Sequence, residues 1–268
     1  AYAKWQIDHE QDILRPGSGF ALVKALLKLN EISKERVVEV LVMSRNSPDT
    51  SLRIFSSIEH YGLDITRAVL SGGTSLSAYL KAFGVDLFLS ANEGDVKDAI
   101  NSGFAAGRIY TNTIYDFDPM KELKQIRIAF DGDAVLFSDE AERIFQKDGL
   151  EAFVENEKQN ARKELPEGPF AKFLKTISDL QKRFEPESSP IRTALVTARN
   201  APAHERVVRT LRAWDVRIDE AFFLGGISKT EVLKAFEPHI FFDDQKVHAD
   251  SASNVVPSAQ VPWKNEKQ

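Results

Sequence analysis

Short apolar runs alternate along this chain with longer segments whose apolar residues recur every three or four positions. The runs are rich in β-branched and aromatic residues, which is typical of strands. They span 37–43, 85–89, 126–130, 193–196 and 239–242. The segments 20–29 and 170–184 carry apolar residues on one face, as amphipathic helices do. Strands that alternate with helices predict an α/β fold in which helices cover both faces of parallel sheets.

Polar residues that can carry chemistry follow three of these runs. They are Asp131 and Asp133, then Thr197, then the pair Asp243 and Asp244. Because ligands of parallel sheets bind beyond the carboxyl ends of the strands, we expect these residues to share one site. Lys229, which follows the turn residues Gly225 and Gly226, adds a cation. Two carboxylates one residue apart at the end of a buried strand are costly unless a cation or a substrate uses them.

Longer strings around these residues resemble a known enzyme family. They read AFDGDAVLFSDE at 129–140, LVTAR at 195–199 and PHIFFDDQ at 238–245. They resemble the cytosolic 5'-nucleotidase I family of the haloacid dehalogenase (HAD) phosphatase superfamily, and the resemblance runs from about residue 16 to residue 263. It implies a Rossmann-like HAD fold and the Mg²⁺-dependent hydrolysis of nucleoside 5'-monophosphates to nucleosides and phosphate.

The resemblance gives roles to the two carboxylates of the 131–133 motif. Asp131 is the expected nucleophile, because a carboxylate can attack phosphorus and form an aspartyl-phosphate that water then hydrolyses. Asp133 is the expected acid/base, which protonates the leaving oxygen and later activates water. Taken alone, Asp-Gly-Asp after a strand is also typical of a solvated turn. The flanking string and the downstream residues favour catalysis.

Thr197 and Lys229 are expected to contact the phosphoryl group. The Thr197 hydroxyl would donate to a phosphoryl oxygen, although a Thr at a strand–helix junction also caps helices. Lys229 would neutralise the phosphate and Asp131, whereas a lone Lys is usually a surface residue. Arg199 has two interpretations, a phosphate contact or a structural role.

The resemblance also implies a Mg²⁺ site. Its expected ligands are Asp131, the backbone carbonyl of Asp133, and Asp243. Asp244 is expected either to support these ligands without touching the ion or to contact the ion through a water molecule. Mg²⁺ prefers oxygen ligands and keeps several waters, so a few carboxylates suffice. The alternative for Asp243 and Asp244 is an Asx turn. The five histidines lack the spacing of a zinc site.

Composition narrows the class of protein. The chain has 268 residues, a net charge of −5 and no cysteine. The negative charge argues against a protein that coats nucleic acid or a membrane surface, and no apolar run is long enough to span a bilayer. The lack of cysteine fits a cytoplasmic protein. We expect a nucleoside monophosphate as the partner and leave a homo-oligomer open.

The chain contains two copies of one plan. LVMSRNSP at 41–48 matches LVTARNAP at 195–202, GGTSLS at 72–77 matches GGISKT at 225–230, and LKAF recurs at 80–83 and 233–236. The first copy lacks the chemistry, since Met43, Leu76, Ser90 and Ala91 stand where the second has Thr197, Lys229, Asp243 and Asp244. We therefore expect a degenerate lobe over 1–124 and a catalytic lobe over 125–268, with 140–190 as a helical cap insertion.

The same repeat predicts a strand before the first residue. The counterpart of the strand 126–130 projects to a position upstream of Ala1. We expect about 20–40 further residues there, from the size of one βα unit, unless another strand, such as 108–111, takes that place. A sheet without this strand would expose main-chain groups beside 37–43.

Two other functions fit part of the pattern. One is a HAD phosphatase for a sugar phosphate or another small phosphoester, because no base-recognition motif is legible and the nucleotide rests on resemblance alone. The other is a nucleotide-binding protein without catalysis. This function is disfavoured because the second copy of the repeat keeps all of its candidate catalytic residues. Phe137, Phe153 and Phe170 are candidates to stack on a base, with core packing as the default for each.

Overall fold

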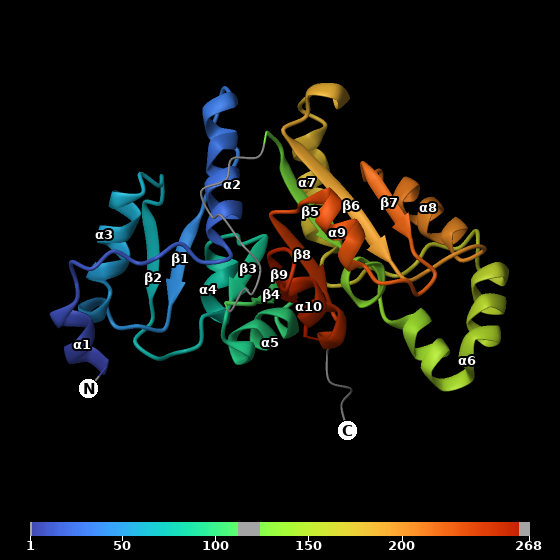
Figure 1. Ribbon diagram of the computed structural model, residues 1–268, viewed down its shortest axis with the longest axis horizontal. Helices are drawn as coiled ribbons and strands as arrows, with labels where there is room; N and C mark the ends of the chain where they lie inside the picture. Colours follow the sequence, from blue (N-terminus) through green and yellow to red (C-terminus); the bar gives the residue numbers. More distant parts are fainter. Residues whose placement is uncertain (1, 112–123, 263–268) are drawn as a thin grey trace.

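A mostly parallel sheet runs through the computed structural model, which describes residues 2–111 and 124–262 (Figure 1). The strands are β1 (Leu41–Ser44), β2 (Arg67–Leu70), β3 (Leu87–Ser90), β4 (Ala105–Ile109), β5 (Ile126–Phe130), β6 (Ile191–Thr197), β7 (Glu220–Phe223), β8 (Ile240–Asp243) and β9 (Ser258–Gln260). The helices are α1 (Tyr2–Asp8), α2 (Phe20–Ile32), α3 (Leu52–His60), α4 (Ser77–Ala82), α5 (Glu93–Asn101), α6 (Glu140–Gln159), α7 (Ala171–Gln181), α8 (His204–Ala213), α9 (Thr230–Phe236) and α10 (Lys246–Ser253).

Seven strands form the main sheet, in the order β3-β4-β9-β8-β5-β6-β7. All neighbours are parallel except β4 and β9. β1 and β2 form a separate two-stranded parallel sheet. β5, which ends just before Asp131, pairs with both β6 and β8. The carboxyl ends of these three strands therefore meet at one edge, as predicted, and the mostly parallel α/β architecture fits a Rossmann-like fold.

Each predicted run contains a strand, but some bounds differ. β5 spans the predicted residues 126–130, whereas β6 extends over Ile191–Thr197 and β1 starts only at Leu41. The apolar pattern misses β2, β4, β7 and β9, and the alternative strand 108–111 overlaps only the end of β4. These strands have three to five residues, and β2 and β7 are only partly buried, so they are too short for a clear alternating pattern.

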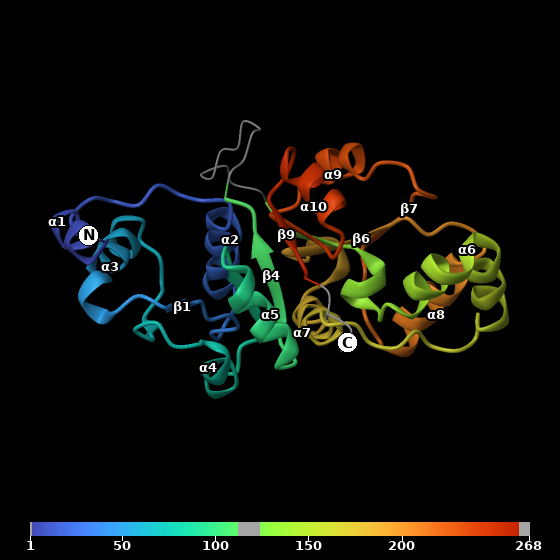
Figure 2. The ribbon, with the colours of Figure 1, turned by 90° about the horizontal axis from the view of Figure 1, so that it is seen from below.

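Successive side chains of β5 enter two separate core clusters, because neighbours on a strand point to opposite faces. Phe130 lies in the larger cluster with Leu174 of α7. Ala129 lies in the smaller cluster with Leu233 of α9. Figure 2 shows α7 and α9 on opposite sides of the sheet. This double burial explains the apolar run 126–130, and it holds the residue that follows, Asp131, in a fixed position.

The segment 140–190 contains two helices in different surroundings. α7 buries Phe173 and Ile177 in the core against the sheet. α6 projects to one side of the second half of the molecule (Figure 1). Gly149, whose φ is +82°, interrupts α6 with a conformation that favours glycine. In the part of the chain that the structure describes, none of the helices has the length and apolarity needed to cross a bilayer.

Candidate active site

The carboxyl ends of β5 and β8 bring two buried carboxylates to one cation. Lys229 Nζ lies 2.8 Å from Asp131 Oδ1 and 2.7 Å from Asp243 Oδ2. The side chains of Lys229, Asp131 and Asp243 are only 7%, 8% and 0% exposed. Three residues that are far apart in the sequence thus form one compact group, as their places after strands and a glycine turn predict.

The position of Lys229 follows from the turn before it. Gly225 and Gly226 have φ values of +59° and +87°, which residues with a Cβ rarely adopt. This turn leads from β7 into α9, and Lys229 is the residue that precedes the first turn of α9. The turn therefore brings the lysine back over the strand ends and lets its ammonium reach both carboxylates.

Charge in this group is only partly balanced. Burial raises the pKa of Asp131 to about 6, against the opposing effect of Lys229. Burial also raises the pKa of Asp244 to about 9, and the carboxylates of Asp131 and Asp243 add to it. Burial opposes the ammonium of Lys229, yet Asp131 and Asp243 hold the pKa of Lys229 above its usual value. One ammonium faces three carboxyl groups, and the raised pKa values of Asp131 and Asp244 show that the site favours further positive charge.

The three carboxylates fit a hard divalent cation. Asp131, Asp243 and Asp244 each offer an oxygen, and these oxygens lie within 4.8 Å of one another. Without a cation, each close pair of ionised carboxylates would repel by about 4 kcal/mol at an effective dielectric constant near 20. Oxygen donors of this kind are those that Mg²⁺ prefers. The side chain of Asp133 lies outside this cluster.

The Asp133 carboxylate is instead paired with a buried arginine. Arg199 Nε donates to Asp133 Oδ2 at 2.8 Å, and Arg199 Nη2 donates to Asp133 Oδ1 at 2.7 Å. Thr197 is buried beside this pair, and its Oγ1 accepts from the Arg199 N–H at 3.3 Å. Of the two interpretations of Arg199, the structure supports a structural role, since the guanidinium is occupied by carboxylates.

The loop from Asp131 to Asp133 is packed closely on Thr197. A Cβ placed on Gly132 would lie 3.3 Å from Thr197 Oγ1, so glycine allows the loop and the hydroxyl to approach. Ala134, just beyond, has a φ of +64°. Gly168 is still more constrained, because a Cβ there would lie 2.3 Å from the Phe137 carbonyl oxygen. These contacts hold Asp131, Asp133 and Thr197 together.

Sequence reasoning missed a buried carboxylate that continues the network. Glu157 of α6 has a fully buried side chain and pairs with the Arg199 Nη1 atom. Its other oxygen, Oε1, lies 2.8 Å from Arg206 Nη1 of α8. Arg206 is itself fully buried and donates from Nε to the Lys163 carbonyl at 2.9 Å. α6 is rich in charged residues, and nothing in its sequence distinguishes Glu157 from its exposed neighbours.

Two of the three phenylalanines considered for base stacking belong to the core. Phe137 and Phe170 have no exposed surface, so neither can reach a ligand. Phe153 is partly exposed, and its ring centroid lies 5.5 Å from the Arg199 guanidinium carbon. His248 lies near the carboxylates, with Nδ1 3.7 Å from Asp243 Oδ1.

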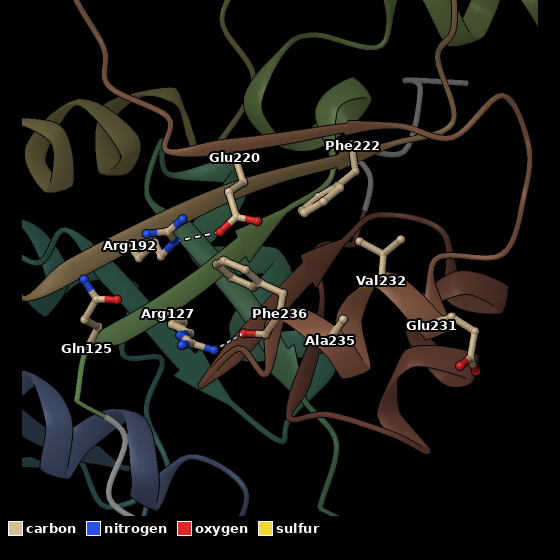
Figure 3. Close-up of a pocket in the computed structure, with 9 residues that line it drawn as sticks. All are labelled: Gln125, Arg127, Arg192, Glu220, Phe222, Glu231, Val232, Ala235 and Phe236. Atoms are coloured by element: carbon tan, nitrogen blue, oxygen red, sulfur yellow. Dashed lines mark hydrogen bonds and ion pairs between the residues drawn. The ribbon is translucent and has the colours of Figure 1, made fainter. Parts of the chain in front are cut away.

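A pocket of about 520 Å³ lies at the opposite ends of the strands. Gln125 and Arg127 at the start of β5, and Arg192 and Glu220 on β6 and β7, line it together with α9 (Figure 3). Arg127 Nη1 donates to the Phe236 carbonyl at 2.8 Å and Arg192 Nε lies 2.6 Å from Glu220 Oε1, whereas Arg127 Nε is buried without a hydrogen-bond partner. The lining includes none of Asp131, Asp243 and Lys229, so this pocket is separate from the carboxylate cluster.

A family model described as 5'-nucleotidase matches residues 1–268. Human cytosolic 5'-nucleotidase 1B is 38% identical over 269 residues, which cover 95% of this chain and 43% of the human protein. The chain thus spans less than half the length of that relative. A chain of the solved Pnkp1/Rnl/Hen1 complex aligns over 95% of this chain and 96% of its own length, at 15% identity and a TM-score of 0.37, a likeness too low to carry an argument.

Proposed function

Because this chain belongs to the 5'-nucleotidase family, we propose that it hydrolyses nucleoside 5'-monophosphates to nucleosides and phosphate, with Asp131 as the nucleophile. The observation that carries this proposal is the buried Lys229 ammonium between Asp131 and Asp243. A lysine that neutralises a buried carboxylate at a strand end is suited to a dianionic substrate, since it offsets the repulsion between nucleophile and phosphate.

The first step transfers the phosphoryl group to the protein. An Asp131 carboxylate oxygen attacks phosphorus, and the bond between phosphorus and the ribose 5'-oxygen breaks. Protonated Asp133 gives its proton to that oxygen, so the nucleoside leaves as an alcohol. Lys229 and the Thr197 hydroxyl would hold phosphoryl oxygens while negative charge shifts among them.

The second step regenerates Asp131. The Asp133 carboxylate takes a proton from water, the water oxygen attacks phosphorus, and the bond between Asp131 and phosphorus breaks. The two hydrogen bonds from Arg199 suit this step, because they hold the Asp133 carboxylate in a fixed direction. For the first step Asp133 must loosen from Arg199 to carry a proton. We propose that Arg199 and Glu157 hold Asp133 in position for both its proton donation in the first step and its proton abstraction in the second.

Asp131, Asp243 and Asp244 would hold Mg²⁺, with the Asp133 carbonyl as a further contact. When bound, the ion would orient the phosphate and offset negative charge in the transition state. The close carboxyl oxygens and the pKa of Asp244, which burial and the carboxylates of Asp131 and Asp243 raise, support this assignment, because a bound cation would offset their repulsion. Asp244 belongs to the same cluster as the other two, so we place it as a direct or water-bridged contact.

We also propose that the two lobes descend from one duplicated unit. The starts of corresponding elements support this, because β2 and β7 start at 67 and 220, β3 and β8 at 87 and 240, and α5 and α10 at 93 and 246. Each pair is 153 residues apart. In the first lobe Leu76 is buried in the core where the second has Lys229, which supports a structural role for 1–124. Within 140–190, α6 is the candidate cap, since α7 packs in the core.

The experiment that tests this function is an assay of phosphate release with and without Mg²⁺ on a panel of nucleoside monophosphates and sugar phosphates. We expect metal-dependent hydrolysis that is fastest on nucleoside 5'-monophosphates. Faster hydrolysis of sugar phosphates would favour the other phosphatase. Nucleotide binding without any phosphate release would favour a non-catalytic binding protein. The cytoplasmic location and a homo-oligomer remain predictions.

A further inference from the structure

A buried arginine of α8 contacts both ends of α6. Arg206 Nη1 lies 2.8 Å from Glu157 Oε1 near the end of α6, and Arg206 Nη2 lies 3.7 Å from Glu140 Oε2 at its start. Neither the Arg206 side chain nor the Glu157 side chain has exposed surface. Figure 2 shows α6 and α8 beside each other at one end of the molecule. Arg206 therefore fixes the place of α6 relative to α8.

The same arginine holds the segment that leads out of α6. Arg206 Nε donates to the Lys163 carbonyl at 2.9 Å, and Arg206 Nη2 donates to the Glu164 carbonyl at 3.4 Å. All three nitrogens of the guanidinium group thus have partners between residues 140 and 164. Because these partners come from three separate places in that segment, one side chain ties the whole of it to α8.

A chain of contacts leads from Arg206 to the acid/base. Glu157 uses Oε1 for Arg206 and Oε2 for Arg199, and Arg199 donates two hydrogen bonds to Asp133. The Arg199 side chain is only 2% exposed, so the chain is closed off from water up to Asp133. We propose that Arg206 is a positioning residue for the proton transfer by Asp133. The proposal rests on the proposed function, in which Asp133 protonates the leaving ribose oxygen.

The sharing of Glu157 explains how Arg206 acts at a distance. Glu157 faces two guanidinium groups and gives one oxygen to each. Without Arg206, both oxygens of Glu157 would be available to Arg199, and carboxylates favour such paired contacts with one guanidinium group. Arg199 would then turn toward Glu157 and α6 would lose its anchor. Asp133 would no longer be held in reach of the leaving oxygen.

This role predicts an effect that depends on the leaving group. A ribose oxygen must gain a proton as its bond to phosphorus breaks, and a positioned acid supplies it. When sulfur replaces that bridging oxygen, the bond between phosphorus and sulfur breaks and a thiolate leaves without needing the proton. A misplaced Asp133 should therefore slow the oxygen substrate and spare the sulfur substrate. A general loss of structure would slow both alike, because it removes the same fraction of working molecules.

The test compares kcat/KM, with Mg²⁺, for the nucleoside 5'-monophosphate that the panel above shows to be hydrolysed fastest and for its 5'-thio analogue. Arg206→Gln should lower kcat/KM by about tenfold or more on the oxygen substrate and by less than about threefold on the sulfur substrate. Equal losses on the two substrates, or no loss on either, would overturn the proposal. A parent chain that hydrolyses no nucleotide would instead refute the proposed function itself.

Arg206→Lys is a second, milder variant. It keeps a positive charge beside Glu157, so no buried carboxylate is left uncompensated. A single ammonium cannot reproduce the planar set of guanidinium contacts, so we expect a loss of about threefold on the oxygen substrate alone. If Arg206→Gln does not fold, a loss in Arg206→Lys that is absent, or equal on the two substrates, would overturn the proposal.

Two controls on α8 separate this role from a general loosening of the helix. Thr210 Oγ1 accepts from the Leu165 N–H at 2.9 Å, so Thr210→Val disturbs the segment after α6 without removing an ion pair. Arg209→Gln removes an exposed charge that pairs with Glu205. Thr210→Val should lower the free energy of unfolding but leave the ratio of the two kcat/KM values unchanged, and Arg209→Gln should change neither. An oxygen-specific loss in either control as large as that of Arg206→Gln would overturn the proposal.

Discussion

Arg199 holds Asp133 through two parallel hydrogen bonds, from Nε to Oδ2 at 2.8 Å and from Nη2 to Oδ1 at 2.7 Å. A carboxyl group in this arrangement is fixed in direction. Because it is turned toward the arginine, Asp133 is kept out of the carboxylate cluster formed by Asp131, Asp243 and Asp244. The acid/base and the metal-binding side chains thus occupy different places, although Asp131 and Asp133 are only two residues apart.

Asp133→Asn should separate proton transfer from metal binding. The amide has the shape of the carboxyl group but cannot shuttle a proton, so kcat for a nucleoside monophosphate should fall by about 10²–10⁴-fold. Mg²⁺ affinity, measured by titration calorimetry, should change little, because the expected contact is the backbone carbonyl. A variant that loses Mg²⁺ binding would show that the side chain itself is a ligand.

Glu157→Gln should destabilise the protein strongly. Glu157 is the fully buried carboxylate shared by Arg199 and Arg206, and removing its charge leaves buried guanidinium groups undercompensated, at a cost of about 3–5 kcal/mol. The free energy of unfolding in urea measures this cost. Glu155→Gln, on the same helix but with its carboxylate bonded to Gln159 at the surface, is the control and should change it by less than about 0.5 kcal/mol. Equal effects of the two substitutions would refute the network.

Lys229→Leu should nearly abolish hydrolysis while the chain still folds. It gives the second lobe the residue that the first lobe has at Leu76, and it leaves Asp131 and Asp243 without their shared cation. Activity is compared with that of Lys234→Leu, which removes an exposed lysine that pairs with Glu231 on the surface of α9. Circular dichroism confirms folding. Retention of most of the activity by Lys229→Leu would contradict the role of the ammonium.

His239 should make the stability depend on pH below neutrality. Burial, with the nearby Arg127, lowers the pKa of His239 to about 4 in the folded protein. Between that value and about 6.5, the unfolded chain binds a proton that the folded chain does not. The contribution of His239 to the free energy of unfolding should therefore be fully present above about pH 6.5, and about 3 kcal/mol of it should be lost as the pH approaches 4.

His239→Asn isolates this contribution. The His239 Nδ1 atom accepts the Arg127 N–H at 3.0 Å, and an asparagine oxygen can replace that acceptor without titrating. Urea unfolding of both proteins across this pH range should show the free energy of unfolding of the parent chain falling relative to that of the variant by about 3 kcal/mol as the pH is lowered. Parallel curves would mean that His239 does not titrate as its burial implies.

The site residues that directly follow a buried strand could be predicted from the sequence. Asp131 and Asp243 come after β5 and β8, whose apolar runs are legible, and the fold places them 2.8 Å and 2.7 Å from the same lysine atom. Arg199 and Glu157 could not be paired from sequence, because their contact depends on how α6 packs on α8. The short strands β2, β4, β7 and β9 were equally hidden, since their stability comes from neighbours in the sheet and not from their own pattern.

The central claim is that Asp131 is the nucleophile of a phosphomonoester hydrolase, and Asp131→Asn tests it most directly. The amide retains the shape of the side chain, and Lys229 keeps Asp243 as a partner, so the variant should fold. Phosphate release from a nucleoside 5'-monophosphate with Mg²⁺ is measured against the parent chain and against Asp148→Asn, an exposed position on α6. We predict a fall of roughly 10³-fold or more for Asp131→Asn alone, and turnover near the parent rate would contradict the claim.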